Sequence, residues 1–294
     1  LLEDPGNGII RDTTPGQVPG PVPFDPVEDV YTINGDDGVR RDGGRLVLHS
    51  FSDFDLTSDE TALYTDTDFD LVTAEQILTR ITGSRPSRLD GQIINNYADA
   101  DLFFVNPNGV FFGSDFALDT RSFFVSTADR LELFDSVDGG TVSLNTTTPI
   151  EVSPLLPGFN FALDEGGVEG VRFLRDDVAD ITVEGFEFLN VDIDGDAELF
   201  FAAGNITFGT EDFPVNIETR GRDLIAIAIG GSGRIFDTSD VPGSNELDLA
   251  ITDLDGNNIN PTGVVSLSGS IDPGGAEVFF LPNGSSELEE VSGT

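Results

Sequence analysis

Side chains that could carry out chemistry are either scarce or scattered along this chain. The 294 residues include one histidine, His49, and no cysteine, against 54 aspartates and glutamates and 14 arginines with no lysine. The lack of cysteine excludes disulfides, thiolate nucleophiles and thiolate metal sites. No partner of a catalytic triad or a metal site lies near His49 in sequence, so we predict a structural role, with its ring hydrogen-bonded near a turn.

Two runs of alternating aspartates are candidates for metal binding: Asp66, Asp68 and Asp70, and Asp192, Asp194 and Asp196. An EF-hand loop needs Gly directly after its third acidic position and Glu at its twelfth, where the second run has Ala197 and Ala203. The glycine-rich nonapeptide repeat that binds calcium is also missing. We therefore interpret both runs as solvated faces and expect no cofactor, with calcium binding as the alternative.

Recognisable catalytic motifs are absent from the sequence. It contains no H-E-x-x-H, G-x-S-x-G, phosphate-binding loop or dinucleotide fingerprint. His49 lies in Leu-His-Ser, whereas polygalacturonase-like sites need Gly-His-Gly. Because 54 carboxylates ensure that some pair lies close together, such a pair is weak evidence for a glycosidase. We expect that the chain is not an enzyme.

The net charge of -40 limits the partners of this protein. Such a surface repels phosphate backbones and anionic lipid, which argues against nucleic-acid binding. Repulsion among the carboxylates also destabilises a compact chain unless salt screens it. Because the acidic residues are spread over the whole sequence, we hypothesise that the source is a salt-adapted (halophilic) bacterium.

The most structured local signal is the turn sequence Asn106, Pro107, Asn108 and Gly109. Pro107 fixes φ near -65° at the second turn position, Asn108 and Gly109 tolerate positive φ, and the Asn106 side chain can bond to backbone two residues on. Two apolar runs flank the turn, and we expect their aromatic side chains to pack around it: Phe103, Phe104, Phe111 and Phe112.

The elements around this turn read as short β-strands. The 34 glycines and 16 prolines interrupt every apolar run, which indicates an all-β protein without a membrane-spanning helix. After residue 129, alternations of three to six residues end in Gly, Asn or Asp, a spacing that favours a parallel β-helix over a β-sandwich. The predicted inward residues are Leu46, Leu48, Phe51, Phe54, Ile181, Val183, Phe186, Phe188, Val191, Ile193, Leu199, Phe201, Ile206 and Phe208. One short helix is predicted over residues 74–80.

Residues 80–129 resemble the haemagglutination-activity motif at the N-terminus of two-partner secretion exoproteins, such as filamentous haemagglutinins. That motif consists of V-T-G-x-x-P-S-x-I-x-G, then Leu-Phe-Leu-x-Asn-Pro-Asn-Gly-Ile-x-Phe-Gly, then Ser-Phe-x-Ala-Ser-Thr-Ala-Asp. Residues 81–91, 102–113 and 122–129 match the three blocks in order and spacing, and residues 46–56 resemble a further segment upstream. The chain departs from the pattern at Arg85, where Asn is usual.

The resemblance implies a right-handed parallel β-helix with an N-terminal cap and short extra-helical strands or hairpins. We expect residues 1–29 to form a Pro/Gly-rich leader or cap and residues 30–155 the secretion core. Residues 156–294 would continue the coils within the same structural domain. At about 20 to 25 residues per coil, roughly ten coils would result.

By resemblance, the chain is the secretion domain of a large adhesin- or haemagglutinin-type surface protein, exported through the periplasm of a Gram-negative bacterium. A cognate outer-membrane barrel transporter would recognise it through POTRA domains, and it would then nucleate β-helix folding outside the cell. The domain would be a monomer that does not insert into membranes, and host or neighbouring-cell glycans or proteins would be its surface partners.

The recognition and folding residues that follow from the resemblance are Asn106, Pro107, Asn108, Gly109, Phe103, Phe104, Phe111, Phe112, Gly113, Pro86 and Gly91. The alternatives are a glycan-binding or calcium-stabilised surface rod, and a polysaccharide-active β-helix enzyme.

Overall fold

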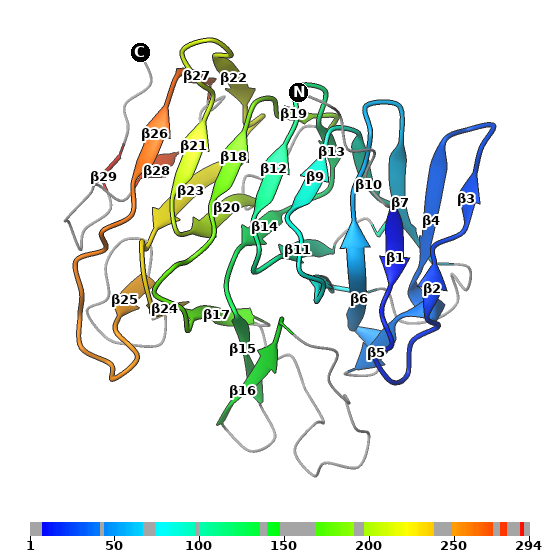
Figure 1. Cartoon of the computed structure of the whole chain (residues 1–294), viewed down its shortest axis with the longest axis horizontal. Helices are drawn as coiled ribbons and strands as arrows, with labels where there is room; N and C mark the ends of the chain where they lie inside the picture. Colours follow the sequence, from blue (N-terminus) through cyan, green and yellow to red (C-terminus); the bar gives the residue numbers. More distant parts are fainter. Residues whose placement is uncertain are drawn as a thin grey trace.

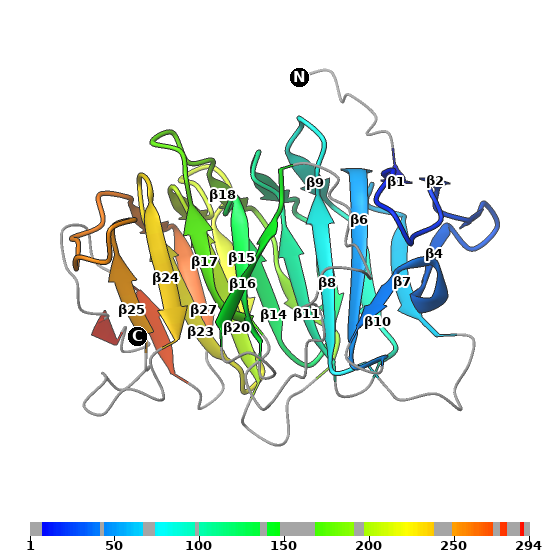
Figure 2. The same cartoon turned by 90° about the horizontal axis from the view of Figure 1, so that it is seen from below.

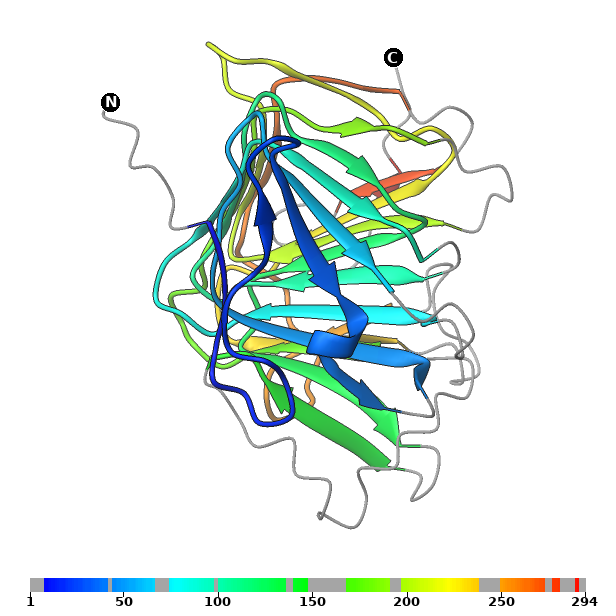
Figure 3. The same ribbon diagram turned by 90° about the vertical axis from the view of Figure 1, so that its right-hand side faces the viewer.

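Three parallel sheets, which we name A, B and C, form the walls of a solenoid (Figure 1). The structure is a computed structural model, and it describes residues 8–41, 44–66, 74–97, 100–135, 140–147, 168–190, 197–237, 249–272, 277–280 and 289–290. From β8 onward the chain runs from sheet A to sheet C, then to sheet B and back to A. Figure 3, which looks along the longest axis, shows the strands of successive coils stacked behind one another.

Sheet A is the longest wall. Its parallel strands are β6 (Leu46–Phe54), β8 (Gln76–Ile81), β11 (Asp101–Val105), β14 (Phe123–Ser126), β20 (Glu198–Ala203), β23 (Asp223–Ala228) and β28 (Val278–Phe280). These strands follow one another in that order across the sheet. Parallel strands lie about 4.8 Å apart, so the described part of the wall is about 30 Å long.

Sheets B and C close the cross-section with shorter strands. Sheet B contains β4 (Val30–Asn34), β7 (Thr61–Thr65), β10 (Gln92–Asn95), β13 (Ala117–Asp119), β19 (Glu187–Phe188), β22 (Val215–Glu218) and β27 (Gly269–Asp272). Sheet C contains β9 (Ser87–Leu89), β12 (Val110–Phe112), β18 (Ile181–Val183), β21 (Ile206–Phe208) and β26 (Val265–Leu267). In strands such as β18 and β21 a less buried residue lies between two buried ones, which is the pattern of a sheet with one face in the core.

Short antiparallel strands cover the N-terminal end of the solenoid. They are β1 (Ile9–Arg11), β2 (Gly20–Pro21), β3 (Phe24–Asp25) and β5 (Val39–Arg41), with a 3-10 turn η1 (Gly35–Asp37) before β5. The strand β1 pairs with β6, and β3 pairs with β4. The first edges of sheets A and B are thereby paired, as expected for a cap. At the other end, β29 (Glu289–Glu290) pairs antiparallel with β28.

A fourth, antiparallel sheet lies outside the solenoid, and we name it sheet D. Its strands are β15 (Arg130–Asp135), β16 (Gly140–Asn145), β17 (Val168–Phe173), β24 (Gly233–Asp237) and β25 (Leu249–Thr252). Figure 2 shows β15, β16, β17 and β24 in front of the strands of sheet A. The chain enters sheet D twice, through β15–β17 and through β24–β25, each time leaving after a strand of sheet A and returning to a strand of sheet C. In the described part of the chain, sheet A has seven parallel strands, whereas ten coils were expected.

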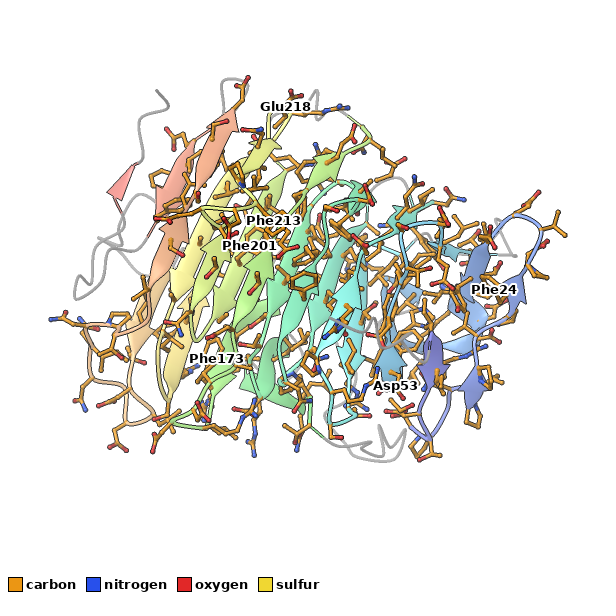
Figure 4. The ribbon with its side chains drawn as sticks, turned by 45° about the horizontal axis from the view of Figure 1, so that its top comes forward. Phe24, Asp53, Phe173, Phe201, Phe213 and Glu218 are labelled. Atoms are coloured by element: carbon orange, nitrogen blue, oxygen red, sulfur yellow. The ribbon has the colours of Figure 1, made fainter. Side chains whose placement is uncertain are left out.

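The lumen of the solenoid is filled with apolar side chains. Of the residues predicted to point inward, Phe51, Phe54, Ile181, Val183, Phe186, Phe188, Leu199, Phe201, Ile206 and Phe208 belong to this core. Val191 and Ile193 lie outside the described residues. Aromatic rings contact one another across the lumen, for example Phe201 of sheet A with Phe208 of sheet C at 5.2 Å between ring centroids. Phe201 is labelled among these side chains in Figure 4.

A second apolar core lies between the outer face of sheet A and sheet D. It includes Phe103, Val105, Leu131, Phe173 and Ile227, and Phe173 is labelled in Figure 4. Both faces of sheet A are therefore buried, which explains uninterrupted apolar runs such as residues 102–105.

Two predictions fail because both faces of sheet A are buried. Leu46 and Leu48 belong to the second core, and Val47 faces the lumen in their place. The helix predicted over residues 74–80 is also wrong, since β8 occupies residues 76–81. In β8, Ile77 faces the lumen and Leu78 the second core, an apolar pattern that periodicity alone cannot distinguish from a helix.

Candidate functional site at the Asn-Pro-Asn-Gly corner

The sequence Asn-Pro-Asn-Gly forms the corner between β11 and β12, where the chain passes from sheet A to sheet C (Figure 1). The backbone N–H of Gly109 donates to the carbonyl of Asn106 at 3.0 Å, which closes a four-residue turn. Gly109 has φ of +112°, a conformation that side chains disfavour. A Cβ atom at this position would lie 3.2 Å from the carbonyl oxygen of Asp180.

Asn106 is completely buried, and its side chain bonds in two directions. Its Oδ1 accepts the backbone N–H of Asn108 at 2.9 Å, the predicted bond within the turn. Its Nδ2 donates to the carbonyl of Arg85 and to the hydroxyl of Ser87, both at 3.0 Å. Because Arg85 and Ser87 lie in the preceding coil, Asn106 fixes two corners against each other.

Asn108 differs from the prediction in conformation. Among the described residues other than glycine, only Asp29 and Arg220 have positive φ, so Asn108 does not use its tolerance of that region. Its contribution is a hydrogen bond, because Nδ2 donates to the carbonyl of Gly83 at 2.8 Å. Asn108 therefore also ties the corner to the preceding coil.

The other small residues assigned to the site lie where strands of neighbouring coils approach closely. A Cβ atom on Gly91 would lie 2.1 Å from the carbonyl oxygen of Glu60, and one on Gly113 would lie 1.9 Å from Oδ1 of Asp90. Pro86 is exposed, and its Cβ lies 3.7 Å from the position of a Cβ on Gly109. These glycines permit close stacking of the coils.

The four phenylalanines do not gather around the turn as expected. Phe104 and Phe112 face the lumen, where Phe112 contacts Phe116 at 4.6 Å between ring centroids. Phe103 lies on the outer face of sheet A, stacked on Phe124 at 4.5 Å. Phe111 is half-buried at the middle of the three-residue strand β12. Adjacent residues of a strand point to opposite faces, so one phenylalanine of each adjacent pair faces the lumen and the other faces away from it.

The three motif blocks lie side by side in three successive coils. In sheet C, Val110 of the second block pairs with Ser87 of the first, and in sheet A, Leu102 of the second block pairs with Phe123 of the third. Beyond these strands, Asn106 N–H donates to the carbonyl of Ser126 at 3.0 Å. The order of the blocks along the sequence is thus their order along the axis.

The third block ends at Asp129, a buried residue at the base of sheet D. Nε of Arg175 lies 2.8 Å from Oδ1 of Asp129 in an ion pair, and Leu174 N–H donates to Oδ2 at 2.8 Å. Arg175 also donates through Nη2 to the carbonyl of Pro107. The corner is therefore covered by the chain segment that returns from sheet D.

A buried polar network beside this site was not predicted from the sequence. Arg80 is completely buried and donates to Ser50 Oγ at 2.8 Å, Thr14 Oγ1 at 2.9 Å and the carbonyl of Asn145 at 2.7 Å. These partners belong to the N-terminal segment, to β6 and to β16. Burial lowers the pKa of Arg80 to about 10, although the charge of Asp12 opposes this shift. Arg80 remains charged at neutral pH.

Asp12 is the acidic member of this network. Its carboxylate accepts hydrogen bonds from Ser50 Oγ and Thr82 Oγ1, both at 2.6 Å, and from Thr14 N–H at 2.8 Å. Burial alone would raise its pKa, but these hydrogen bonds from Ser50, Thr14 and Thr82 lower it overall. In the sequence, the only signal for this network was the position of Arg80 at the end of an apolar run.

His49 lies in the core, without the hydrogen bond predicted for its ring. It is completely buried on the lumen side of β6, with its ring 5.9 Å from that of Tyr64 and 6.1 Å from that of Phe51. Neither ring nitrogen has a hydrogen-bond partner in the described part of the chain. Burial and the charges of Arg11 and Arg40 lower its pKa to about 3, so the ring is neutral.

The described residues contain no group of three or more His, Cys, Asp or Glu side chains arranged to hold a metal ion. Of the two aspartate runs, only Asp66 is described, and it pairs with Arg40. The remaining five aspartates lie outside the described residues. Nor do the described residues include a helix of the length and hydropathy needed to cross a membrane.

The fold and the corner define a class of protein: an all-β, right-handed parallel β-helix with an N-terminal cap and extra-helical strands. Residues 28–275 match the family model described as the TPS secretion domain. The chain belongs to this family, whose members act in two-partner secretion with an outer-membrane transporter and are parts of exported proteins of Gram-negative bacteria.

Two solved structures are similar to the chain. The crystal structure of the filamentous hemagglutinin secretion domain matches with a TM-score of 0.51 and 14% identity, over 90% of this chain and 75% of that chain. The HMW1 secretion domain from Haemophilus influenzae has a TM-score of 0.44 and 12% identity, over 92% of this chain and 60% of that chain. The first likeness shows the fold. No protein of curated function matches the sequence.

Proposed function

We propose that the chain is the secretion domain of an adhesin- or haemagglutinin-type surface protein, recognised by the POTRA domains of its transporter. In this proposal the domain emerges from the transporter unfolded and nucleates β-helix folding at the cell surface. The observation that carries it is the stacking of the three motif blocks in successive coils, with Asn106 joining the second block to the first. Residues 30–155 would form the core of this activity and residues 156–294 would extend it.

The geometry of the corner favours recognition of the unfolded chain. Asn106 is completely buried, and its side-chain oxygen and nitrogen are both engaged within the protein. A folded corner therefore offers a partner none of the polar groups of Asn106. In an unfolded chain the same residues are exposed, and an extended segment can add as a strand to the edge of a POTRA sheet.

Electrostatics favours a basic transporter surface. Arg residues of this chain are largely paired internally, for example Arg172 and Arg234 with Glu132 at 2.7 and 2.5 Å. These pairs belong to the folded chain, and an unfolded chain with 54 acidic residues against 14 arginines carries the same net charge of -40. A channel lined with Arg or Lys would attract such a chain, and salt would weaken this attraction.

The proposal is tested by expressing the chain behind a signal peptide, with and without its neighbouring transporter. We expect the protein in the medium only when the transporter is present, and in the periplasm otherwise. Retention in the periplasm in both cases would overturn the proposal and favour a β-helical adhesin or a polysaccharide-active enzyme. Export without the transporter would also overturn it.

We also propose that the acidic surface is an adaptation to a salty environment. Repulsion among carboxylates opposes folding in dilute buffer, and added salt screens it over about 10 Å at 0.1 M. The melting temperature should therefore rise when NaCl is raised from 0.05 to 1 M. A flat or falling melting temperature would contradict this proposal, and a rise specific to CaCl2 would indicate calcium sites instead.

A further inference from the structure

The long excursion from β14 into sheet D begins and ends beside the Asn-Pro-Asn-Gly corner. The chain leaves after Ser126, forms β15, β16 and β17, and returns to sheet C at Ile181. Its two ends contact each other, because Thr127 Oγ1 donates to the carbonyl of Ala179 at 2.8 Å and Asp129 N–H donates to the carbonyl of Arg172 at 3.0 Å. The base of the excursion is thus closed by hydrogen bonds.

Arg175 connects this base to the corner. Its guanidinium pairs with Asp129 at 2.8 Å and donates to the carbonyl of Pro107. The side chain of Asp129 is only 4% exposed, whereas that of Arg175 is 40% exposed. A buried carboxylate needs a counter-charge. Asp129 therefore stabilises the arrangement in which the chain has returned from sheet D and Arg175 lies beside it.

We propose that Arg175 is a positioning residue that closes the corner, so that residues 106–109 reach their final conformation only when the sheet D excursion has docked. The planar guanidinium can contact a carboxylate and a carbonyl in one fixed geometry. Residues 107 and 175 are distant in sequence, which makes this contact a late one in folding. Docking of the excursion then covers the corner. During export, this docking would withdraw the motif from the transporter, a consequence that rests on the proposed function.

The test is hydrogen exchange at the corner of the purified chain, and it does not involve the transporter. In Arg175→Ala we expect the amides of Asn108 and Gly109 to exchange at least tenfold faster than in the wild type. The amides of Leu224 and Ile225 in β23 should change by less than about twofold. Arg175→Lys should restore protection only in part, because an ammonium is a point donor. Arg45→Ala, which removes an ion pair with Glu75 at 2.5 Å, is the matched control and should leave the corner unchanged.

The proposal would be overturned if the corner amides of Arg175→Ala exchanged at the wild-type rate. It would also be overturned if exchange were accelerated equally at every amide. If Arg175→Ala does not fold, pulse-labelled refolding of the wild type provides the second test. Gly109 and Asp129 amides should then gain protection together, and later than Phe104. Earlier protection of Gly109 than of Asp129 would overturn the proposal.

Discussion

The side-chain amide of Asn106 donates a hydrogen bond of 3.0 Å to the hydroxyl of Ser87, 19 residues earlier in the sequence. Both side chains are buried, with exposed fractions of 0% and 1%. Through this contact the Asn-Pro-Asn-Gly turn and the start of β9 in the preceding coil fix each other's position. The spacing of the motif blocks in the sequence is therefore the spacing of one coil.

Asn106→Asp should destabilise the protein by about 2 kcal/mol or more. The substitution preserves shape and the bond to Asn108 N–H, but it removes both donors to Arg85 and Ser87 and buries a charge. Urea denaturation measures the effect. Asn96→Asp is the control, because Asn96 is exposed, and it should shift the midpoint little. Equal midpoints for the two variants would contradict this assignment.

Gly109→Ala should cost about 1 to 3 kcal/mol through backbone strain. The residue has φ of +112°, and the added Cβ would meet the carbonyl of Asp180 at 3.2 Å. Gly231→Ala is the comparison, since a Cβ there would meet nothing closer than 3.9 Å. Thermal melts of both variants check the prediction, and a Gly109→Ala melt at the wild-type temperature would refute it.

Arg80→Met should destabilise the chain by about 3 kcal/mol. Methionine preserves much of the volume but leaves Ser50, Thr14 and Asn145 without three hydrogen bonds from a charged donor. Because these partners belong to separate segments, limited proteolysis should cut the N-terminal segment faster in the variant. Arg88→Met, at an exposed position, should not have this effect. A resistant N-terminal segment in Arg80→Met would count against the network.

Acidification should destabilise the protein in part through His49. Its pKa is about 3 in the folded protein and 6.5 in an unfolded chain, so below pH 6.5 the unfolded state binds a proton that the folded state does not. The free energy of unfolding therefore falls as pH falls, by about 2 kcal/mol between pH 7 and pH 5 from this group. His49→Leu should lose this part of the pH dependence in urea melts. An unchanged pH dependence would show that His49 does not titrate as described.

The sequence predicted the parts of the fold that local alternation encodes. Three-residue strands such as Ile181–Val183 and Ile206–Phe208 bury their first and last residues, so their inward residues were predicted correctly. Sheet A gives no such signal, because its outer face is buried under sheet D. For this reason Leu46 and Leu48 were assigned to the wrong core and residues 74–80 to a helix.

The corner was predicted in its local part only. The bond from Asn108 N–H to the Asn106 side chain lies within the turn, where sequence-local rules apply. The bonds from Asn106 to Ser87, from Asn108 to Gly83 and from Arg175 to Pro107 span 19, 25 and 68 residues. Contacts of that range depend on the stacking of the coils, and no spacing within one turn indicates them.

Export of Asn106→Asp, compared with that of a variant of equal stability, tests the central claim most directly. The comparison variant is Phe173→Leu, which changes a completely buried residue of the second core. Its urea midpoint can be matched to that of Asn106→Asp. Both are expressed with the transporter, and the fraction in the medium is measured. If the corner is the recognition and folding element, Asn106→Asp should be exported much less than Phe173→Leu. Equal export of the two would contradict the account and reduce the corner to a contribution to stability.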